Sequence, residues 1–86
     1  MFLSLNVDVS NAGISKGIVG PGYWVHGVSG TSLQSKFTTY RSSYGHASTV
    51  DGGGEYVSGG WKPRYVMSNG SQYATSRGNK AYYNWK

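Results

Sequence analysis

The chain contains no cysteine, and this absence excludes a disulfide framework and any metal site built from thiolates. It has only three acidic residues, Asp8, Asp51 and Glu55, and two histidines, so few groups are available to act as catalytic acids, bases or metal ligands. Good helix formers are scarce. No apolar run approaches the roughly 18 to 20 residues that span a bilayer. From these absences we expect a small, strand-rich protein without disulfide cross-links.

Glycine and large aromatic rings dominate what is present, because the 86 residues include 14 Gly, eight Tyr and three Trp. A chain of this length buries only roughly 60 to 65% of the surface that its unfolded form exposes, so we expect one domain with a thin core. Aliphatic side chains are few, and the rings must therefore supply most of that core. Frequent Gly, Ser and Thr favour short strands joined by tight turns, which predicts an all-β fold.

Positive charge is in clear excess. Eight Lys and Arg residues oppose the three acids, which gives a formal net charge of +5. This balance favours anionic partners such as nucleic acid, anionic lipid, or wall polymers and their phosphorylated precursors. The cations form no continuous run, so only folding could gather them into one patch.

The first 20 residues differ from the rest of the chain. Their opening, MFLSLNVDVSNA, lacks the cationic start and apolar core of a complete signal peptide, although Ser10 and Ala12 fit the small-x-small pattern of a cleavage site. The segment closes with a Gly-Pro-Gly sequence, which interrupts a strand rather than continuing it. We interpret residues 1–20 as an N-terminal arm or the remnant of an export signal, and residues 21–86 as the folded domain.

The middle of the chain predicts one three-stranded sheet. Tyr23–Gly27 is typical of a first strand, residues 36–44 of a second and His46–Val50 of a third. A Gly, Ser and Thr loop over Val28–Ser35 separates the first two. Glu55–Val57, between two glycine clusters, predicts a short edge segment.

The last third predicts a three-stranded meander. Asn69-Gly70 is a strong signal for a type I′ hairpin turn, and Gly78-Asn79 fits a type II′ turn. Two-residue turns at both places would pair Val66 with Tyr73 and would fix which side chains share a face. An alternative turn at residues 77–79 would exchange the two faces of the last strand.

The two faces of this meander differ in chemistry. One is apolar and expected to be buried: Trp61, Tyr65, Met67, Ala74, Ala81, Tyr83 and Trp85. The other faces solvent, and we predict that its cations and tyrosines bind the ligand: Lys62, Arg64, Tyr73, Arg77, Lys80 and Tyr82. An isolated ribbon is marginal in water, so the apolar face needs the strands of the first half as a cover. This need predicts a small β-sandwich of two three-stranded antiparallel sheets.

No catalytic or metal-binding motif occurs. The nearest approach to a Gly-x-Ser-x-Gly elbow, the sequence around Ser29, lacks the second glycine at the required place. His26 and His46 offer two metal ligands where a site needs three or four. We therefore predict no enzymatic activity, no metal and no cofactor.

Four landmarks follow one another along the chain: YWVHG, YRSSYGHASTV, SGGWKPRYV and NKAYYNW. In this order and spacing they resemble the lactococcin 972 family of bacteriocins over roughly residues 22–85. Family-like residues stand at Trp24, His46, Trp61, Lys62, Ala81, Tyr82, Tyr83 and Trp85. The chain departs from the family in lacking the cysteines that many members carry and in having Lys86 after the usual aromatic end. Its residues 1–20 also match neither a full export signal nor a typical mature start.

The resemblance implies a β-sandwich secreted by a producer bacterium, which blocks septum formation in related Gram-positive cells by binding the wall precursor lipid II. It implies the target-cell envelope as the place of action, with a dedicated immunity protein and exporter as partners. Cations suit the pyrophosphate of such a target, and aromatic rings suit its sugars. Two alternatives stay open: a single-stranded nucleic-acid binder, ranked lower because no base-stacking motif occurs, and a non-toxic wall- or glycan-binding module.

Overall fold

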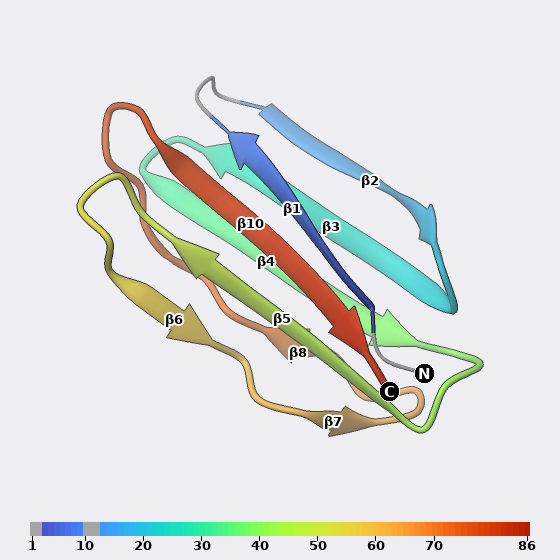
Figure 1. Cartoon of the computed structure of the whole chain (residues 1–86). Helices are drawn as coiled ribbons and strands as arrows, with labels where there is room; N and C mark the ends of the chain where they lie inside the picture. The colour runs from blue at the N-terminus through green and yellow to red at the C-terminus, as the bar shows by residue number, and fades with distance from the viewer. Residues whose placement is uncertain (1–2, 10–12) are drawn as a thin grey trace.

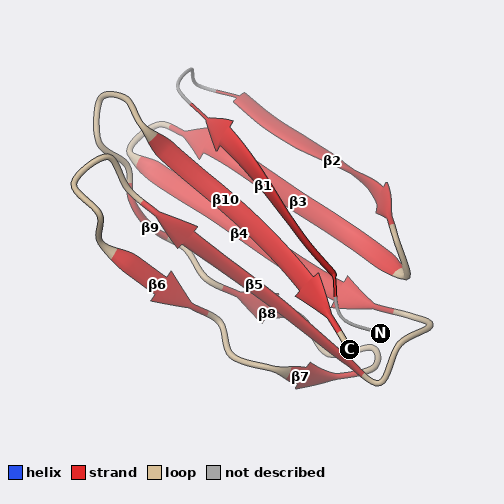
Figure 2. Cartoon of the chain, in the orientation of Figure 1, coloured by secondary structure: helices blue, strands red, loops and turns tan. Residues whose placement is uncertain are grey.

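The computed structural model describes the backbone of residues 3–9 and 13–86, and side chains from residue 13 onward. This part of the chain forms strands and no helix, and so it has no helix that could cross a membrane. The ten strands are β1 (Leu3–Val9), β2 (Gly13–Val19), β3 (Gly22–Ser29), β4 (Ser32–Thr39), β5 (Tyr44–Val50), β6 (Tyr56–Ser58), β7 (Lys62–Pro63), β8 (Ser68–Asn69), β9 (Gln72–Tyr73) and β10 (Asn79–Trp85). Figures 1 and 2 show them as two layers.

Each layer is an antiparallel sheet of five strands. Sheet A has the order β1-β10-β5-β6, with β7 also paired to β5, and sheet B has the order β2-β3-β4-β8, with β9 also paired to β4. The predicted all-β sandwich of two antiparallel sheets is therefore confirmed. The strands are more numerous than the predicted three per sheet, because the start of the chain and the short edge segments add to both layers.

The first 20 residues supply one edge strand to each sheet. β1 pairs with β10 from Leu3 to Val9, and β2 pairs with β3 from Gly13 to Val19. The suggested cleavage site at Ser10 and Ala12 lies outside the described residues. An origin of this segment in an export signal stays a prediction.

The first two predicted strands have different bounds from those expected. The loop predicted over Val28–Ser35 was wrong, because β3 and β4 together cover most of these residues. Only a tight turn at Gly30 and Thr31 separates the two strands. Gly30 has a φ of 58°, a conformation that glycine adopts without steric cost. The predicted second strand, residues 36–44, is interrupted after Thr39 by a turn that leads into β5.

The Asn69-Gly70 hairpin was also wrong. β8 and β9 lie one after the other along the same strand, β4, where Ser68 pairs with Phe37 and Tyr73 with Ser32. The backbone N–H of Gly70 donates to the Ser35 carbonyl at 2.9 Å, so the chain stays extended. A Cβ atom at Gly70 would lie 2.7 Å from the Ala47 carbonyl oxygen of the other sheet. Gly70 therefore permits a close approach between the sheets and does not form a turn.

The second predicted hairpin, at Gly78-Asn79, is a crossover between the sheets. Residues 74–78 carry the chain from β9 in sheet B to β10 in sheet A. The side chain of Asn79 organises this loop, since its Oδ1 accepts from the Thr75 N–H at 2.9 Å and its Nδ2 donates to the Thr75 carbonyl at 2.8 Å. The expected meander is therefore absent, and β10 pairs with β1 and β5 instead.

The core between the sheets is built from aromatic rings flanked by small side chains. Trp24 of β3 and Phe37 of β4 lie with ring centroids 4.7 and 5.0 Å from the Tyr83 ring of β10. Ala47 and Ala81 complete the cluster, and both are fully buried. The predicted burial of Ala81 and Tyr83 is confirmed.

Two of the residues expected in the core lie outside it. Tyr65 is 70% exposed and Met67 is 51% exposed, so their predicted burial was wrong. They belong to a loop between β7 and β8, in which Tyr65 has a φ of 71°, and not to a strand over the core. Trp61, Ala74 and Trp85 are half-buried.

A buried hydroxyl joins the two sheets at the centre of the core. The Oγ atom of Ser35, on β4, accepts from the Trp24 indole N–H at 2.9 Å and donates to the Tyr82 carbonyl of β10 at 2.7 Å. The indole N–H is thereby satisfied where no water reaches it. The same hydroxyl fixes the backbone of β10 relative to sheet B.

A second serine joins the sheets near their edge. Between β6 and β7 the edge segment of sheet A has a bulge: Ser58 pairs with Ser48 and Lys62 with Gly45, so it has one residue more than β5 between these pairs. Beside this bulge the backbone N–H of Ala47 donates to Ser68 Oγ of β8 at 3.0 Å. Ser68 Oγ in turn donates to the Gly60 carbonyl at 2.6 Å. Groups that the bulge would leave unpaired are therefore satisfied by the opposite sheet.

We predict that Ser35→Ala lowers the free energy of unfolding by about 2 kcal/mol, because it leaves the buried Trp24 N–H without an acceptor. Urea denaturation measures this loss. In a Trp24→Phe background the same change is expected to cost about 1 kcal/mol less, since the donor is gone. The exposed Ser43→Ala serves as control and should stay within about 0.5 kcal/mol of wild type. Equal costs in both backgrounds would contradict the assigned hydrogen bond.

Candidate functional site

The outer face of sheet A is set by the alternation of β5 and β10. Tyr83 points into the core, so its neighbours Tyr82 and Asn84 point to the other side of the strand. β5 places Ser48 opposite Tyr82 and His46 opposite Asn84, and residues paired in this way share a face. Two central strands of the sheet therefore present polar and aromatic side chains together.

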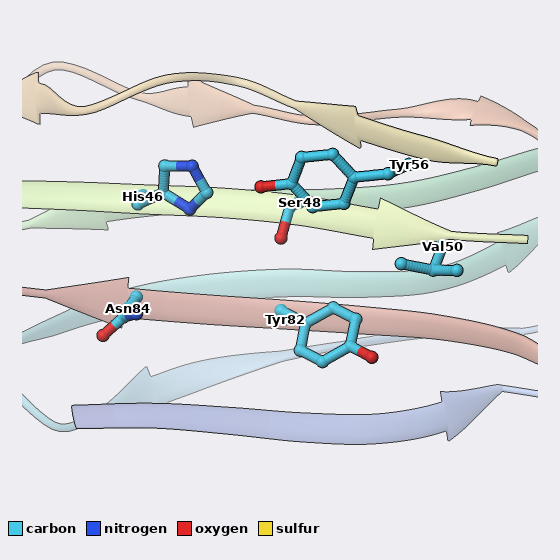
Figure 3. Close-up of a pocket in the computed structure, with 6 residues that line it drawn as sticks. All are labelled: His46, Ser48, Val50, Tyr56, Tyr82 and Asn84. Atoms are coloured by element: carbon cyan, nitrogen blue, oxygen red, sulfur yellow. The ribbon is translucent and has the colours of Figure 1, made fainter. Parts of the chain in front are cut away.

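These side chains line a shallow cavity of about 380 Å³ on the outer face. Figure 3 shows the rings of Tyr56 and Tyr82 over neighbouring strands, with Ser48 and Val50 of β5 between them. Tyr56 comes from β6, where it pairs with Val50. We call this site the outer-face cavity, and its lining residues are His46, Ser48, Val50, Tyr56, Tyr82 and Asn84.

One end of the cavity is bounded by His46 and its neighbours. The Nε2 atom of His46 shares a hydrogen bond of 2.7 Å with Ser58 Oγ, and the imidazole lies 5.0 Å from the Trp61 ring, centroid to centroid. The ammonium of Lys86 lies 4.5 Å from the Trp61 ring centroid, within the range of a cation–π contact. Burial lowers the pKa of His46, which favours the neutral imidazole at neutral pH.

The other end of the cavity is bounded by a cation. Lys80 stands beside Val50 in the register of β10 with β5, and Asp8 of β1 is its register partner on the other side. Hydroxyl, amide and imidazole groups in the cavity can exchange hydrogen bonds with a polyol, while the tyrosine rings can cover apolar C–H surfaces. Among the side chains described from residue 13 onward, no three His, Asp or Glu residues meet to hold a metal ion.

Two of the six residues predicted to bind ligand are on this face. Tyr82 lines the cavity and Lys80 lies beside it. Lys62 was expected on the same face but pairs with Gly45 of β5. Gly45 faces the core, because a Cβ atom there would lie 3.0 Å from the Phe37 ring. Lys62 is therefore at the sheet edge, on the side of β5 opposite to the cavity.

The other three predicted residues lie elsewhere. Arg64 is exposed in the loop after β7, where its Nε donates to the Ser42 carbonyl at 3.1 Å. Tyr73 lies on β9 at the edge of sheet B and is 83% exposed, and Arg77 is exposed in the crossover loop. The expected single surface of four cations and two tyrosines does not form, because it depended on the meander that the structure replaces.

Sequence reasoning did not assign to the site five of the residues that line the cavity: His46, Ser48, Val50, Tyr56 and Asn84. The signal that could have found two of them is the predicted strand His46–Val50, because alternation along it puts His46 and Ser48 on one face. What the sequence could not supply was the neighbour of that strand. The pairing of β5 with β10 joins segments from the middle and the end of the chain, and no local turn signal specifies it.

Comparison of the chain with protein-family models, with curated proteins and with solved structures found no match. The resemblance to the lactococcin 972 family therefore rests on the four sequence landmarks, and it supports only a proposal about function.

Acidification is expected to destabilise the fold through its two histidines. Burial lowers the pKa of both His26 and His46, and His26 also stacks on Trp24 at 3.7 Å with its buried Nδ1 unpartnered. The unfolded chain, with a histidine pKa of about 6.5, binds more protons than the folded chain as the pH falls. We predict that stability in urea is greatest above about pH 7 and is lost progressively as the pH falls through about 6.5 towards 5.

A His26→Gln/His46→Gln variant is expected to lose most of this dependence, because neither position can then take up a proton. Histidine ring signals followed by NMR give the two pKa values directly, and both should fall below about 6.5. Constant or rising wild-type stability between pH 7 and 5 would refute the assignment.

Proposed function

We propose that this protein is a secreted, bacteriocin-like antimicrobial protein that binds lipid II through the outer-face cavity and blocks septum formation in related Gram-positive bacteria. The observation that carries the proposal is the convergence of Tyr82, Tyr56 and the polar groups of β5 and β10 in one cavity beside Lys80. The four sequence landmarks supply the bacteriocin part of the proposal. A non-toxic module that binds wall glycan through the same cavity is the alternative.

The chemistry of the cavity suits an anionic glycan head group. A sugar ring has an apolar C–H face, which tyrosine rings cover, and a rim of hydroxyls, which Ser48 and Asn84 can meet. Lys80 beyond Val50 can form a charge-assisted hydrogen bond to a phosphate or carboxylate oxygen. The volume of about 380 Å³ is at the small end of the range of about 300 to 1,000 Å³ for ligand sites, which fits a head group rather than a polymer.

The strands hold this site in place before ligand arrives. β5 and β10 are central in sheet A, and the Tyr82 carbonyl is tied to Ser35 of the other sheet at 2.7 Å. A site on paired strands loses less conformational entropy on binding than one on free loops. The single-stranded nucleic-acid alternative has lost its main support, because the predicted stripe of interleaved cations and tyrosines is dispersed over both sheets.

Two substitutions at the cavity test the ligand assignment. Tyr82→Ala and Lys80→Gln should each weaken binding of lipid II about tenfold, by loss of ring contact and of a charge-assisted hydrogen bond respectively. Isothermal titration with lipid II in neutral detergent micelles measures this. Tyr73→Ala and Arg77→Gln are controls, because they remove a phenol ring and a positive charge from positions outside the cavity, and they should change affinity less than about twofold.

Saturable binding that all four variants weaken equally, or no binding by wild type, would overturn the ligand assignment. Growth assays distinguish the bacteriocin hypothesis from the alternative of a non-toxic wall-binding module. Sensitive cells treated with a bacteriocin should fail at the division plane, and the Tyr82→Ala protein should lose potency in proportion to its affinity.

A further inference from the structure

The sandwich has one end at which several segments of the chain are tied together. The N–H of Tyr40 donates to the Pro21 carbonyl at 2.9 Å, and the N–H of Tyr65 donates to the Thr39 carbonyl at 2.9 Å. Tyr44 and Lys86 exchange two backbone hydrogen bonds of 2.9 and 3.1 Å. Figure 1 shows the C-terminus at this end, beside the turns that follow β2 and β4. The side chains here are therefore presented on fixed backbone.

Most of the exposed large apolar side chains gather at this end. Of the nine such residues with described side chains, six belong to it, and among these six the largest exposed fractions are those of Ile18 at 84% and Tyr65 at 70%. Ile18 and Tyr40 line one shallow hollow of about 350 Å³, and the Tyr40 and Tyr65 rings lie 6.0 Å apart. We call the six the apolar end: Ile18, Tyr40, Tyr44, Tyr65, Val66 and Met67.

Cations stand among these apolar side chains. Arg41 lines the same hollow as Ile18, and Arg64 is fixed by its hydrogen bond to the Ser42 carbonyl. Lys86 lies 5.9 Å from the Tyr44 ring centroid. The apolar end thus combines a hydrophobic surface with positive charge.

Negative charge lies at the opposite end. Asp51 and Glu55, the only carboxylate side chains from residue 13 onward, follow β5, which begins at the apolar end and runs about 20 Å away from it. Asp51 is fixed there, since its Oδ1 accepts from the Gly53 and Glu55 N–H groups at 2.9 Å. Arg77 belongs to the same end, because the Thr75 hydroxyl accepts from the Gly52 N–H at 2.7 Å and donates to the Arg77 carbonyl at 3.0 Å. Among the described side chains, no acid opposes the cations of the apolar end.

We propose that the apolar end docks the protein on the surface of a bilayer that contains anionic lipids. Aliphatic and tyrosine side chains prefer the boundary between head groups and acyl chains, and arginines beside them meet lipid phosphates. A protein partner would need its own acidic, apolar surface of matching shape, whereas an anionic bilayer offers both properties without a specific fit. This interaction needs no glycan, so it goes beyond the proposed binding of lipid II.

Vesicle sedimentation tests the docking. The full chain should bind vesicles of phosphatidylcholine with about one third phosphatidylglycerol, and it should bind vesicles of phosphatidylcholine alone at least about tenfold more weakly. Raising the salt to about 0.5 M should weaken binding, because surface charge is screened over a shorter distance. Arg41→Gln should lower the partition coefficient about fivefold, and Ile18→Ser/Tyr40→Ser about tenfold or more.

Matched controls lie away from the apolar end. Arg77→Gln removes the same charge and Tyr73→Ser a more exposed ring, and both should bind vesicles as wild type does. Thermal unfolding checks that the Ile18→Ser/Tyr40→Ser protein stays folded. If that protein does not fold, the Arg41→Gln variant still tests the docking independently. Equal binding to neutral and anionic vesicles, or equal losses in controls and test variants, would overturn the proposal. The vesicles contain no lipid II and the micelle titration contains no anionic phospholipid, so failure of one proposal leaves the other standing.

Discussion

The structure depends on the contact of two rings of sheet B with one ring of sheet A. Trp24 and Phe37 pack on Tyr83 at centroid distances of 4.7 and 5.0 Å, and this is the centre of a thin core. Rings of this size leave room only for small neighbours, which Ala47, Ala81 and the close approach at Gly70 provide. A chain of 86 residues without a disulfide gains much of its stability from this one layer.

The same contact determines what the outer face of sheet A presents. Because Tyr83 must point inward, the pleat of β10 turns Tyr82 and Asn84 outward, and the burial of Ala47 does the same for His46 and Ser48 on β5. The Ser35 hydroxyl then ties the backbone of Tyr82 to the indole of Trp24. Core and cavity therefore lie on opposite faces of the same strands, so the packing that fixes the core also fixes the backbone of the cavity.

This coupling explains which features the sequence could predict. Alternation along the last strand is local, so the inward Tyr83 and the outward Lys80 and Tyr82 could be inferred from the residues alone. The all-β class and the aromatic core followed from composition. These inferences located β5 and β10, two of the three strands that line the cavity, and assigned Lys80 and Tyr82 of β10 to the right face.

The remaining features depend on contacts between distant segments. Asn69-Gly70 has a strong local preference for a hairpin, but β4 offers the unpaired edge on which Ser68 and Tyr73 form backbone hydrogen bonds. The local preference for one turn type is outweighed by several such bonds, each of which contributes about 0.5 to 1.5 kcal/mol. The predicted burial of Tyr65 and Met67 was wrong for a related reason, since β7 ends after two residues and both side chains belong to the loop that follows it. The partner of each strand, and not its existence, was beyond local reasoning.

The cavity and the apolar end, if both act as proposed, constrain each other. Docking through the turns that close one end of the sandwich would stand β5 and β10 upright on the bilayer, with His46 and Asn84 nearer to the lipid than Val50 and Lys80. A head group anchored in that bilayer would enter the cavity from the His46 end. Its phosphates would then lie nearer to Lys86, which approaches the Trp61 ring at 4.5 Å, than to Lys80. Lys80 would then contact an anionic group in the part of the head group farther from the bilayer, so the two ends of the cavity would bind different parts of the same ligand.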